Sequence, residues 1–450
     1  MPLLLTVSLP CAIAFVQTPP PASTAIVPAD TAWMLMSTAL VLLMTPAVGF
    51  FYGGLVRSKN ALNTMMMCVG ALAGVGVLWA LVGYSLAFGG TAPFVGGWQY
   101  LLLRDVGLEA RGSIPHLLFM AYQGTFAVVT ATLIAGAVVE RMRFGAFLTF
   151  IAAWSLVVYA PVAHWVWGNG WLGTLGVLDF AGGTVVHINA GMAALVAAPL
   201  VGQRKDYGRQ AMLPHNVPFV LLGTALLYFG WFGFNGGSAL AANGSAVLAF
   251  TNTLLAPMAS LAVWMALDAL RTRRATAVGG ATALVVGLVV ITPAAGFVSP
   301  RGALAMGALG ALPSYVAILW RARTRLDDSL DVVAGHGIGG ISGALLTGVF
   351  ASAAWGGTNG LLHGRPGQLG LQVIGVLATL AYSGVGTFVV LKVIGLVMPL
   401  RAATRAEGVG MDITQHGEEA YVEGEGAVLV FRDPVPKTAS TIRSTTAGVA

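Results

Sequence analysis

The stretches AGGTVVHINAG, residues 181–191, and AGHGIGGISG, residues 334–343, decide the fold. Each places one histidine, His187 or His336, inside a long apolar run that is rich in glycine. Ionisable side chains are costly to bury in an apolar medium, so a pair of them in such runs indicates a function. Small neighbouring residues let helices approach closely, which could bring the two imidazoles into contact.

The rest of the chain has the composition of a membrane protein. Of 450 residues, 57% are hydrophobic and 9% are charged, and the mean hydropathy is +0.82. Soluble domains carry about 25% charged residues, so this chain has too few charges to cover a soluble surface. That excludes a cytosolic enzyme, a nucleic-acid-binding protein and a disulfide-stabilised secreted module. The net charge of +6 reflects basic residues at helix ends.

Long apolar runs separated by short polar loops predict eleven membrane spans. Each run is near or above the length of about 20 residues that a helix needs to cross the hydrocarbon. The runs are continuously apolar, whereas the strands of a membrane barrel alternate, so helices are the spanning elements. The expected spans are 33–56, 62–88, 115–139, 144–167, 181–201, 217–235, 247–270, 276–293, 302–320, 332–352 and 369–397.

The basic residues predict how these spans are oriented. Thirteen Lys and Arg residues fall in loops that follow odd-numbered spans, and four fall in loops that follow even-numbered spans. Because basic loops stay on the cytoplasmic side, the N-terminus is expected outside and the C-terminus inside. The sequence thus predicts an all-α, multi-pass protein of the cell membrane.

The two histidine-bearing spans are five apart, so one enters the membrane where the other leaves it. His187 lies about two turns from the external start of its span, and His336 lies at a comparable depth from the cytoplasmic start. This is the arrangement expected of two five-helix halves of inverted topology, with a site near mid-membrane at their interface. One further helix completes the count. The alternative is two unrelated structural histidines, each hydrogen-bonded to a neighbouring helix.

The two ends of the chain differ from the middle. Residues 3–16 form a short apolar run followed by a proline-rich stretch, which resembles the hydrophobic region and cleavage zone of a signal peptide. Residues 1–30 are therefore expected to be a signal peptide and extension, with an uncleaved extension as the alternative. Residues 401–450 form a polar tail, which the predicted topology places in the cytoplasm.

Polar and aromatic residues near the external ends of the spans are further candidates. Asp179 can cap the helix of span five or bias an external cation site. Asp331 has the same capping interpretation before span ten and is not expected to bind a ligand. Aromatic rings that attract cations, together with one hydroxyl, suit a small hydrogen-bonding cation, although an interfacial aromatic belt is the alternative. These candidates are Phe126, Trp167, Trp171, Trp231 and Phe234, with Ser238 as the hydroxyl.

Several other patterns carry no function. The segment 335–340 fits GxGxxG but lies inside a span, without the strand and acid of a dinucleotide site. Asn243 begins a glycosylation sequon of a kind that is common by chance. The sequence has no Walker A motif and no Cys/His spacing typical of zinc, and Cys11 and Cys68 are expected to be unpaired. No cofactor and no metal are therefore expected.

Six stretches together resemble the ammonium transporter (Amt/Mep/Rh) family, over about residues 31 to 422. DFAGGTVVHINAG is similar to the family signature. The stretches, in chain order, are YQGTF at 122–126, PVAHWVWGNG at 161–170, DFAGGTVVHINAG at 179–191, GWFGFNGGS at 230–238, DVVAGHGIGG at 331–340 and EGVGMDITQHGEEAY at 407–421.

The resemblance implies an external site and a gate. Trp167, Phe126 and Ser238 match the family's ammonium recruitment site, and Asp179 supports it. Phe126 and Phe234 match the stacked pair that forms a gate beneath that site. The presence of Trp167 and Ser238 favours the Amt branch over the Rhesus branch.

The resemblance also implies the pore. His187 and His336 line it, and Trp231 packs near them. Tyr122 stands where Phe is common in the family, which predicts a change in vestibule polarity. The implied function is an ammonium transporter or channel, not an enzyme, in which a histidine accepts or relays the proton and ammonia crosses. A sensor of ammonium and a Rhesus-like channel for a neutral gas are the alternatives.

The resemblance implies the assembly and partners as well. Residues 31–400 form the transmembrane domain, with eleven helices in an inverted 5+5 pseudo-repeat plus one. Three copies form a homotrimer in membrane lipid with one pore per subunit. Residues 401–450 form a regulatory tail, and a PII-type signal protein is the expected partner at the cytoplasmic face; a nucleic-acid partner is not expected.

Overall fold

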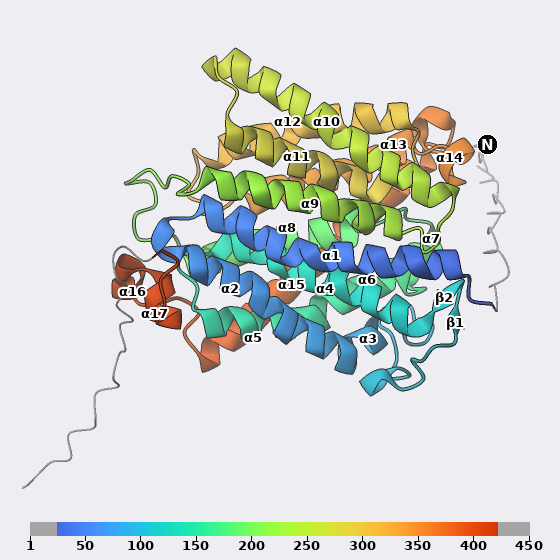
Figure 1. The fold of residues 1–450 in the computed structure, drawn as a ribbon, viewed down its shortest axis with the longest axis horizontal. Coiled ribbons are helices and arrows are strands. Elements are labelled where there is room, and N and C mark those ends of the chain that lie inside the picture. Colours follow the sequence, from blue (N-terminus) through green and yellow to red (C-terminus); the bar gives the residue numbers. More distant parts are fainter. Residues whose placement is uncertain (1–24, 422–450) are drawn as a thin grey trace, which may run out of the picture.

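Long helices that run along a common direction build the whole molecule (Figure 1). The structure is a computed structural model that describes residues 25–421. The apolar run 3–16 with Cys11 and the tail beyond residue 421 lie outside the described residues. Cys68 is fully buried and is a free thiol.

The described residues contain eleven helices that are long and apolar enough to cross a membrane, which confirms the predicted number. The first begins at Pro28, earlier than expected, and the fourth continues to Leu175 through an additional short helix. The helices run Pro28–Leu55, Ser58–Phe88, His116–Val138, Phe144–Leu175, Gly183–Val201, Val217–Gly237, Gly244–Thr272, Ala277–Ala294, Pro300–Arg321, Val333–Phe350 and Gly367–Val397.

Six of these spans are single α-helices, and the other five are composite. The single helices are α1 (Pro28–Leu55), α4 (His116–Val138), α9 (Val217–Gly237), α10 (Gly244–Thr272), α12 (Pro300–Arg321) and α15 (Gly367–Val397). The composite spans contain α2 (Ala61–Ala71) with α3 (Tyr84–Phe88), α5 (Phe144–Trp154) with α6 (Ala160–Trp167) and α7 (Trp171–Leu175), η6 (Gly183–Ile188) with α8 (Asn189–Val201), α11 (Ala277–Ile291) with η7 (Thr292–Ala294), and η8 (Val333–Ile338) with α13 (Gly339–Phe350). The short elements used below are β1 (Ala110–Arg111), β2 (Ile114–Pro115), α16 (Thr404–Val409) and α17 (Met411–His416).

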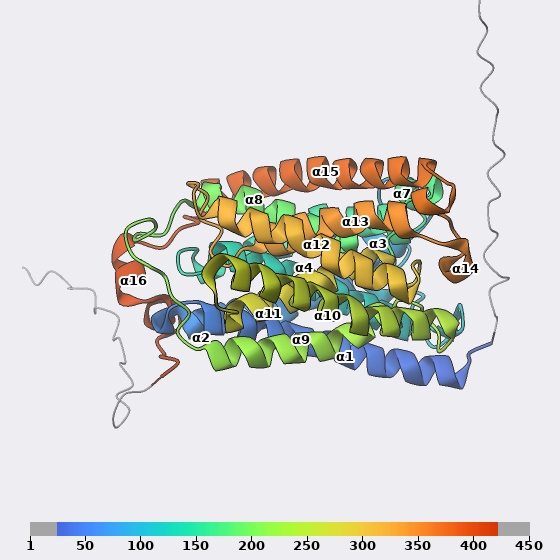
Figure 2. The ribbon, with the colours of Figure 1, turned by 90° about the horizontal axis from the view of Figure 1, so that it is seen from above.

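The packing of the first five spans is repeated in the next five. In the first half α4 packs against α1 and α8, and in the second half their equivalents α11, α9 and α13 pack in the same way. The halves meet where α1 packs against α9 and where α8 packs against η8. The eleventh span, α15, has no counterpart in the repeat and lies along the side of the bundle opposite α1 and α9 (Figure 2). This is the expected arrangement of five plus five plus one.

Glycine permits the central crossing between the halves. A Cβ atom added to Gly191 would lie 2.3 Å from the Cα atom of Gly337, so the two backbones are in direct contact there. A Cβ atom on Gly340 would lie 3.0 Å from the backbone nitrogen of Ile188. Small residues at such positions let helices pack closely without a hydrophobic driving force. This crossing brings the two histidine-bearing segments together.

One end of the bundle is held by buried ion pairs. Arg204 contacts Glu140 at 2.9 Å and Asp327 at 2.7 Å, and Arg57 contacts Glu140 at 3.1 Å. These residues come from loops after spans one, three, five and nine, so the cluster joins both halves of the molecule. α16 and α17 lie at this end, and β1 and β2 lie at the other (Figure 1). The basic loops predicted to be cytoplasmic therefore gather at the end that carries the tail.

The tail is docked onto these loops as far as Tyr421. The Asp412 carboxylate accepts hydrogen bonds from the backbone N–H groups of Leu62 and Asn63, at 3.0 and 2.7 Å, and so caps the start of α2. The Tyr421 hydroxyl lies 2.9 Å from Nε2 of His215, in the loop before α9. The tail thus contacts the start of span two and the loop after span five.

Candidate functional site

The two predicted histidines meet in the middle of the bundle. Nδ1 of His187 lies 3.2 Å from Nδ1 of His336, and the rings are stacked with centroids 5.3 Å apart. The pair can share one proton, because one Nδ1 donates while the other accepts. His187 is 1% exposed and His336 is 6% exposed. The structure therefore does not support two unrelated histidines, each bonded to its own neighbour.

Both histidines lie in π-helical segments, a feature that the sequence did not reveal. His187 falls in η6 and His336 in η8. In η6 the backbone N–H of His187 donates to the carbonyl of Gly182, five residues earlier, at 3.0 Å. Widened turns of this kind occur frequently at functional sites, since they redirect a side chain that a regular helix would point elsewhere.

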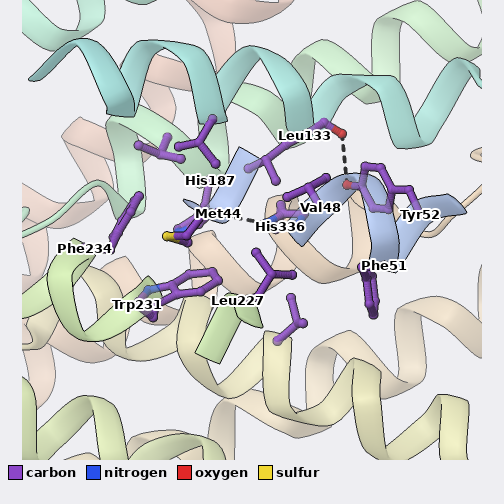
Figure 3. A pocket seen from close by; sticks show the side chains of 13 residues that line it. Met44, Val48, Phe51, Tyr52, Leu133, His187, Leu227, Trp231, Phe234 and His336 are labelled. Atoms are coloured by element: carbon purple, nitrogen blue, oxygen red, sulfur yellow. Dashed lines mark hydrogen bonds between the residues drawn. The ribbon is translucent and has the colours of Figure 1, made fainter. Parts of the chain in front are cut away.

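A narrow apolar cavity lies beside the histidine pair (Figure 3). The volume of this cavity is about 20 Å³, which is enough for about one small molecule. The Trp231 ring stacks on His187 at 5.5 Å, and its Nε1–H donates to Thr292 Oγ1 at 2.9 Å. The remaining lining is almost wholly apolar: Met44, Val48, Phe51, Tyr52, Val129, Leu133, Val186, Leu227, Phe234 and Val285.

Two phenylalanine rings separate this cavity from the end of the bundle that carries β1 and β2. Phe126 and Phe234 stack with centroids 4.2 Å apart, and Phe234 lies 6.1 Å from the His187 ring. Trp167 meets Phe126 edge-on at 5.9 Å on the other side. Both phenylalanines are 1% exposed, whereas Trp167 is only partly buried. The rings thus form a closed layer with the tryptophan at its outer rim.

The Ser238 hydroxyl lies at the same level as this aromatic layer. Its Oγ donates to the carbonyl of Phe234 at 2.8 Å and lies 3.3 Å from the Tyr122 hydroxyl. The Tyr122 hydroxyl also contacts the carbonyls of Gly233 and Phe234, each at 3.0 Å. The extra oxygen of Tyr122 therefore bonds to the end of α9 and to Ser238, so the hydroxyl that Phe lacks is tied into the wall of the site.

Asp179 caps the histidine-bearing segment of span five. Both carboxylate oxygens accept hydrogen bonds from the protein, from the backbone N–H groups of Gly182, Gly183, Thr184 and Val185 and from the Thr184 hydroxyl. The backbone carbonyl of Asp179 accepts the Trp167 Nε1–H at 2.9 Å. Burial raises the pKa of Asp179 above its usual value, and the accepted hydrogen bonds oppose that rise. The residue fixes both the rim tryptophan and the start of η6.

Asp328 has the same relation to the second histidine, which sequence reasoning missed. It lies eight residues before His336, as Asp179 lies eight before His187. Its carboxylate accepts the backbone N–H of Val333, the first residue of η8, at 2.7 Å. Burial raises the pKa of this carboxyl to about 7. The equal spacing of Asp179 and Asp328 from their histidines was the available signal; the sequence instead suggested Asp331 as the cap, and Asp331 pairs with Arg321.

The opposite side of the histidines opens toward the end that carries the tail. A cavity of about 210 Å³ lies there, lined in part by Tyr52, Arg321, Asp331 and His336. Asp331 forms an ion pair with Arg321 and has a positive φ of 59°. The Tyr52 hydroxyl donates to the carbonyl of Leu133 at 3.1 Å, at the junction with the narrow cavity (Figure 3).

The geometry defines a class of protein. Within residues 25–421, no group of three or more His, Cys, Asp and Glu side chains is placed to hold a metal ion. The centre is instead a narrow apolar cavity beside two histidines in contact, and it lies inside a bundle of helices long enough to span a membrane. These features define a multi-pass membrane protein that passes a small solute.

Comparison with known sequences identifies the family. A sequence model of the Ammonium Transporter Family matches residues 32–421. The ammonium transporter of Bacillus subtilis is 45% identical over 398 residues, covering 87% of this chain and 98% of the relative. That of Aquifex aeolicus is 48% identical over 397 residues, covering 87% and 93%. The chain belongs to the Ammonium Transporter Family, whose members are transporters and not enzymes.

Solved structures agree with this assignment. Candida albicans Mep2 superimposes with a TM-score of 0.79 at 38% identity, over 83% of this chain and 85% of that chain. A structure named "Sensor Amt Protein" superimposes with a TM-score of 0.81 at 30% identity, over 86% of this chain and 98% of that chain. The fold of the whole membrane domain is therefore shared with both.

Proposed function

We propose that the protein takes up ammonium at the external aromatic site, deprotonates it and conducts ammonia past the histidine pair. Trp167, Phe126 and Ser238 receive the cation, and Phe126 with Phe234 gates the passage below. The observation that carries this proposal is the Nδ1–Nδ1 contact of 3.2 Å beside a passage with an otherwise almost wholly apolar lining. The proton passes to the histidine pair and is relayed to the other side separately from the neutral ammonia, so that each ammonium ion taken up moves one positive charge across.

Desolvation explains why such a passage selects ammonium. A bare cation in an apolar passage loses its hydration without replacement oxygens, which is prohibitively costly. Potassium has no means to escape that cost. Ammonium escapes it by giving up a proton, and imidazole is the side chain whose ordinary pKa suits that exchange near neutral pH. The histidines thus couple selection to proton transfer.

Currents from reconstituted protein test this mechanism. In liposomes on a solid-supported membrane, the wild-type protein is expected to give a saturable ammonium current. His187→Ala and His336→Ala should abolish that current or admit potassium, because the proton acceptor is lost and the passage widens. A saturable, ammonium-selective current in both variants would contradict the role of the histidines.

The same preparation separates the alternatives. A wild-type protein that gives no current but collapses a pH gradient on ammonium addition conducts neutral ammonia, as a Rhesus-like channel would. A protein with neither signal, but with saturable binding, is a sensor, an alternative favoured by its structural similarity to the "Sensor Amt Protein". The retained Trp167 and Ser238 support transport through a cation site over a neutral gas channel.

We infer the surroundings of the transporter from the resemblance and the charge pattern. The end with α16, α17 and the basic loops faces the cytoplasm, and the first residue described, Ala25, leads to the outside. Residues 1–30 comprise a signal peptide that is removed and an extension that remains on the mature protein, and three copies assemble as a trimer in the membrane. N-terminal sequencing of the mature protein and native mass spectrometry in detergent test these two statements; an intact Met1 or a monomer would overturn them.

The docked tail supports a regulatory role for residues 401–450, with a PII-type protein at the cytoplasmic mouth. Asp412→Ala removes the cap from the N-terminus of α2, which costs about 1 kcal/mol. We expect limited trypsin digestion to cut at Arg401 and Arg405 several times faster in this variant than in the wild type, and ammonium transport to change with it. The exposed Glu418→Ala is the matched control. Equal cleavage in all three proteins would show that Asp412 does not hold the tail.

A further inference from the structure

The eleventh helix holds the loop that precedes Asp179. Gln372 lies on α15 and is 1% exposed. Its side-chain carbonyl accepts the backbone N–H of Leu178 at 2.7 Å, and its amide donates to the backbone carbonyl of Leu178, also at 2.7 Å. The second amide hydrogen reaches the carbonyl of Ala344 on α13 at 3.1 Å. One side chain thus pairs with both backbone groups of Leu178 and ties the loop to two helices.

Every hydrogen-bonding position of the Gln372 side chain is occupied. Its two donors and two acceptor positions are all used, because Gln368 donates to the same carbonyl oxygen at 3.3 Å. Gln368 also donates to the carbonyl of Gly176 at 3.0 Å, so a second residue one turn earlier holds the same loop. A Cβ atom on Gly375 would lie 2.8 Å from Val177 Cγ1, which shows how closely the loop lies on the helix.

The loop held in this way positions the external site. Asp179 follows Leu178 directly, and its carbonyl fixes the indole of Trp167 at 2.9 Å. Its carboxylate caps η6, which carries His187. A shift of Leu178 would therefore move the rim tryptophan first, while the histidine pair is also held by the Gly191–Gly337 crossing between the two halves of the bundle.

We propose that Gln372 is a positioning residue for the external cation site, and that the eleventh helix sets the affinity for ammonium through it. This inference rests on the proposed function of Trp167 at that site. It assigns a role to the helix that has no counterpart in the repeat. Gln372 itself touches neither the passage nor the solute. Its effect is on capture and not on conduction.

The test separates capture from conduction. Full-length Gln372→Met is reconstituted in liposomes, and the ammonium current is measured across a range of concentrations. The variant leaves both backbone groups of Leu178 unpaired at similar side-chain volume. We expect the half-saturating ammonium concentration to rise about tenfold, while the maximal current stays within about twofold of the wild type, because the pore residues are untouched. An unchanged half-saturating concentration, or a loss of maximal current alone, overturns the inference.

Three further variants make the result specific. Thr379→Val is the matched control, since Thr379 is fully buried two turns along α15 and its hydroxyl has no hydrogen-bond partner among residues 25–421. This variant should behave as wild type, and the same rise in it would overturn the inference. Trp167→Leu should raise the half-saturating concentration at least as much as Gln372→Met. If Trp167→Leu has no effect, the proposed cation site is wrong; if it has an effect and Gln372→Met has none, only the role of Gln372 is wrong.

Folding of the variant is checked separately. If Gln372→Met does not reach the membrane, Gln368→Met carries the test, because it loses the contact to Gly176 and leaves Gln372 in place. A smaller rise in the half-saturating concentration, in the same direction, supports the inference, and no rise overturns it. Peptide-level hydrogen exchange over residues 176–182 should increase in whichever variant is measured and stay unchanged in Thr379→Val.

Discussion

Replacing Asp179 by alanine is expected to abolish ammonium-dependent current. Five protein donors lose their acceptor at once, and they lie at the start of the segment that carries His187. Unpaired buried donors cost about 1–3 kcal/mol each when no water replaces the partner. A displacement of about 1 Å at a reacting group costs about 100-fold in rate. We therefore expect a fall of more than about 100-fold, measured on the same solid-supported membranes as the histidine variants.

The control for this prediction is another acid at the same end of the bundle. Asp30 is partly buried and accepts a hydrogen bond from the backbone N–H of Ala242 at 2.8 Å. Asp30→Ala should keep the wild-type current. A current of more than about one tenth of the wild-type value in Asp179→Ala would show that the cap is dispensable.

Arg204→Met is expected to cause the largest loss of stability. Arg204 is paired with Glu140 and Asp327, and all three side chains are buried. Methionine fills similar space but carries no charge. The carboxylates of Glu140 and Asp327 therefore remain buried without the positive charge of Arg204 beside them. Removing one partner from a buried ion pair costs about 3–5 kcal/mol. Thermal unfolding in detergent at pH 8 should show a clearly lower midpoint than in the wild type.

The pH dependence of this loss has a definite sign. Burial alone would raise the pKa of Glu140 and of Asp327, but their arginine partners, chiefly Arg204, hold both pKa values below the usual range. A lowered folded-state pKa contributes stability that is present above the unfolded value, near 4, and is lost as the pH falls through the folded value. In Arg204→Met burial dominates and raises these pKa values, so protonation relieves the variant as the pH falls.

The midpoint difference between wild type and Arg204→Met should therefore shrink between pH 8 and pH 5. Arg209→Met, an exposed arginine in the same loop, is the control and should match the wild type at both pH values. A difference of equal size at pH 8 and pH 5 would mean that the destabilisation comes from lost packing and not from the unpaired carboxylates.

Hydropathy and charge predicted the number of helices and the meeting of the two histidines, because both features follow from patterns that extend over the whole membrane domain. The length of an apolar run reports membrane crossing, and the spacing of His187 and His336 reports the inverted repeat. The π-helical turns were not predictable in this way, since hydropathy does not distinguish a bond to the fifth preceding residue from one to the fourth. Span ends shifted by a few residues for the same reason.

The partners of the site residues were also beyond the sequence. Trp231 pairs with Thr292, and Leu178 pairs with Gln372, across separations of 61 and 194 residues. A buried glutamine or threonine in an apolar run has many possible neighbours, and only the folded structure selects one. The capping role of Asp179, by contrast, was predictable, because it depends on residues within six positions of it.

The contact between Gly191 and Gly337 has a consequence for how turnover is limited. Two backbones that already touch at the centre of the bundle leave no room there for one half to slide past the other. The proposed function fits this contact, because each passage would need only local side-chain motion and the dehydration of one solute. Under the proposed mechanism such a conduit imposes no direction of its own: the electrochemical gradient sets the direction of flux, and where that gradient points outward, something beyond the passage has to stop the leak of nitrogen.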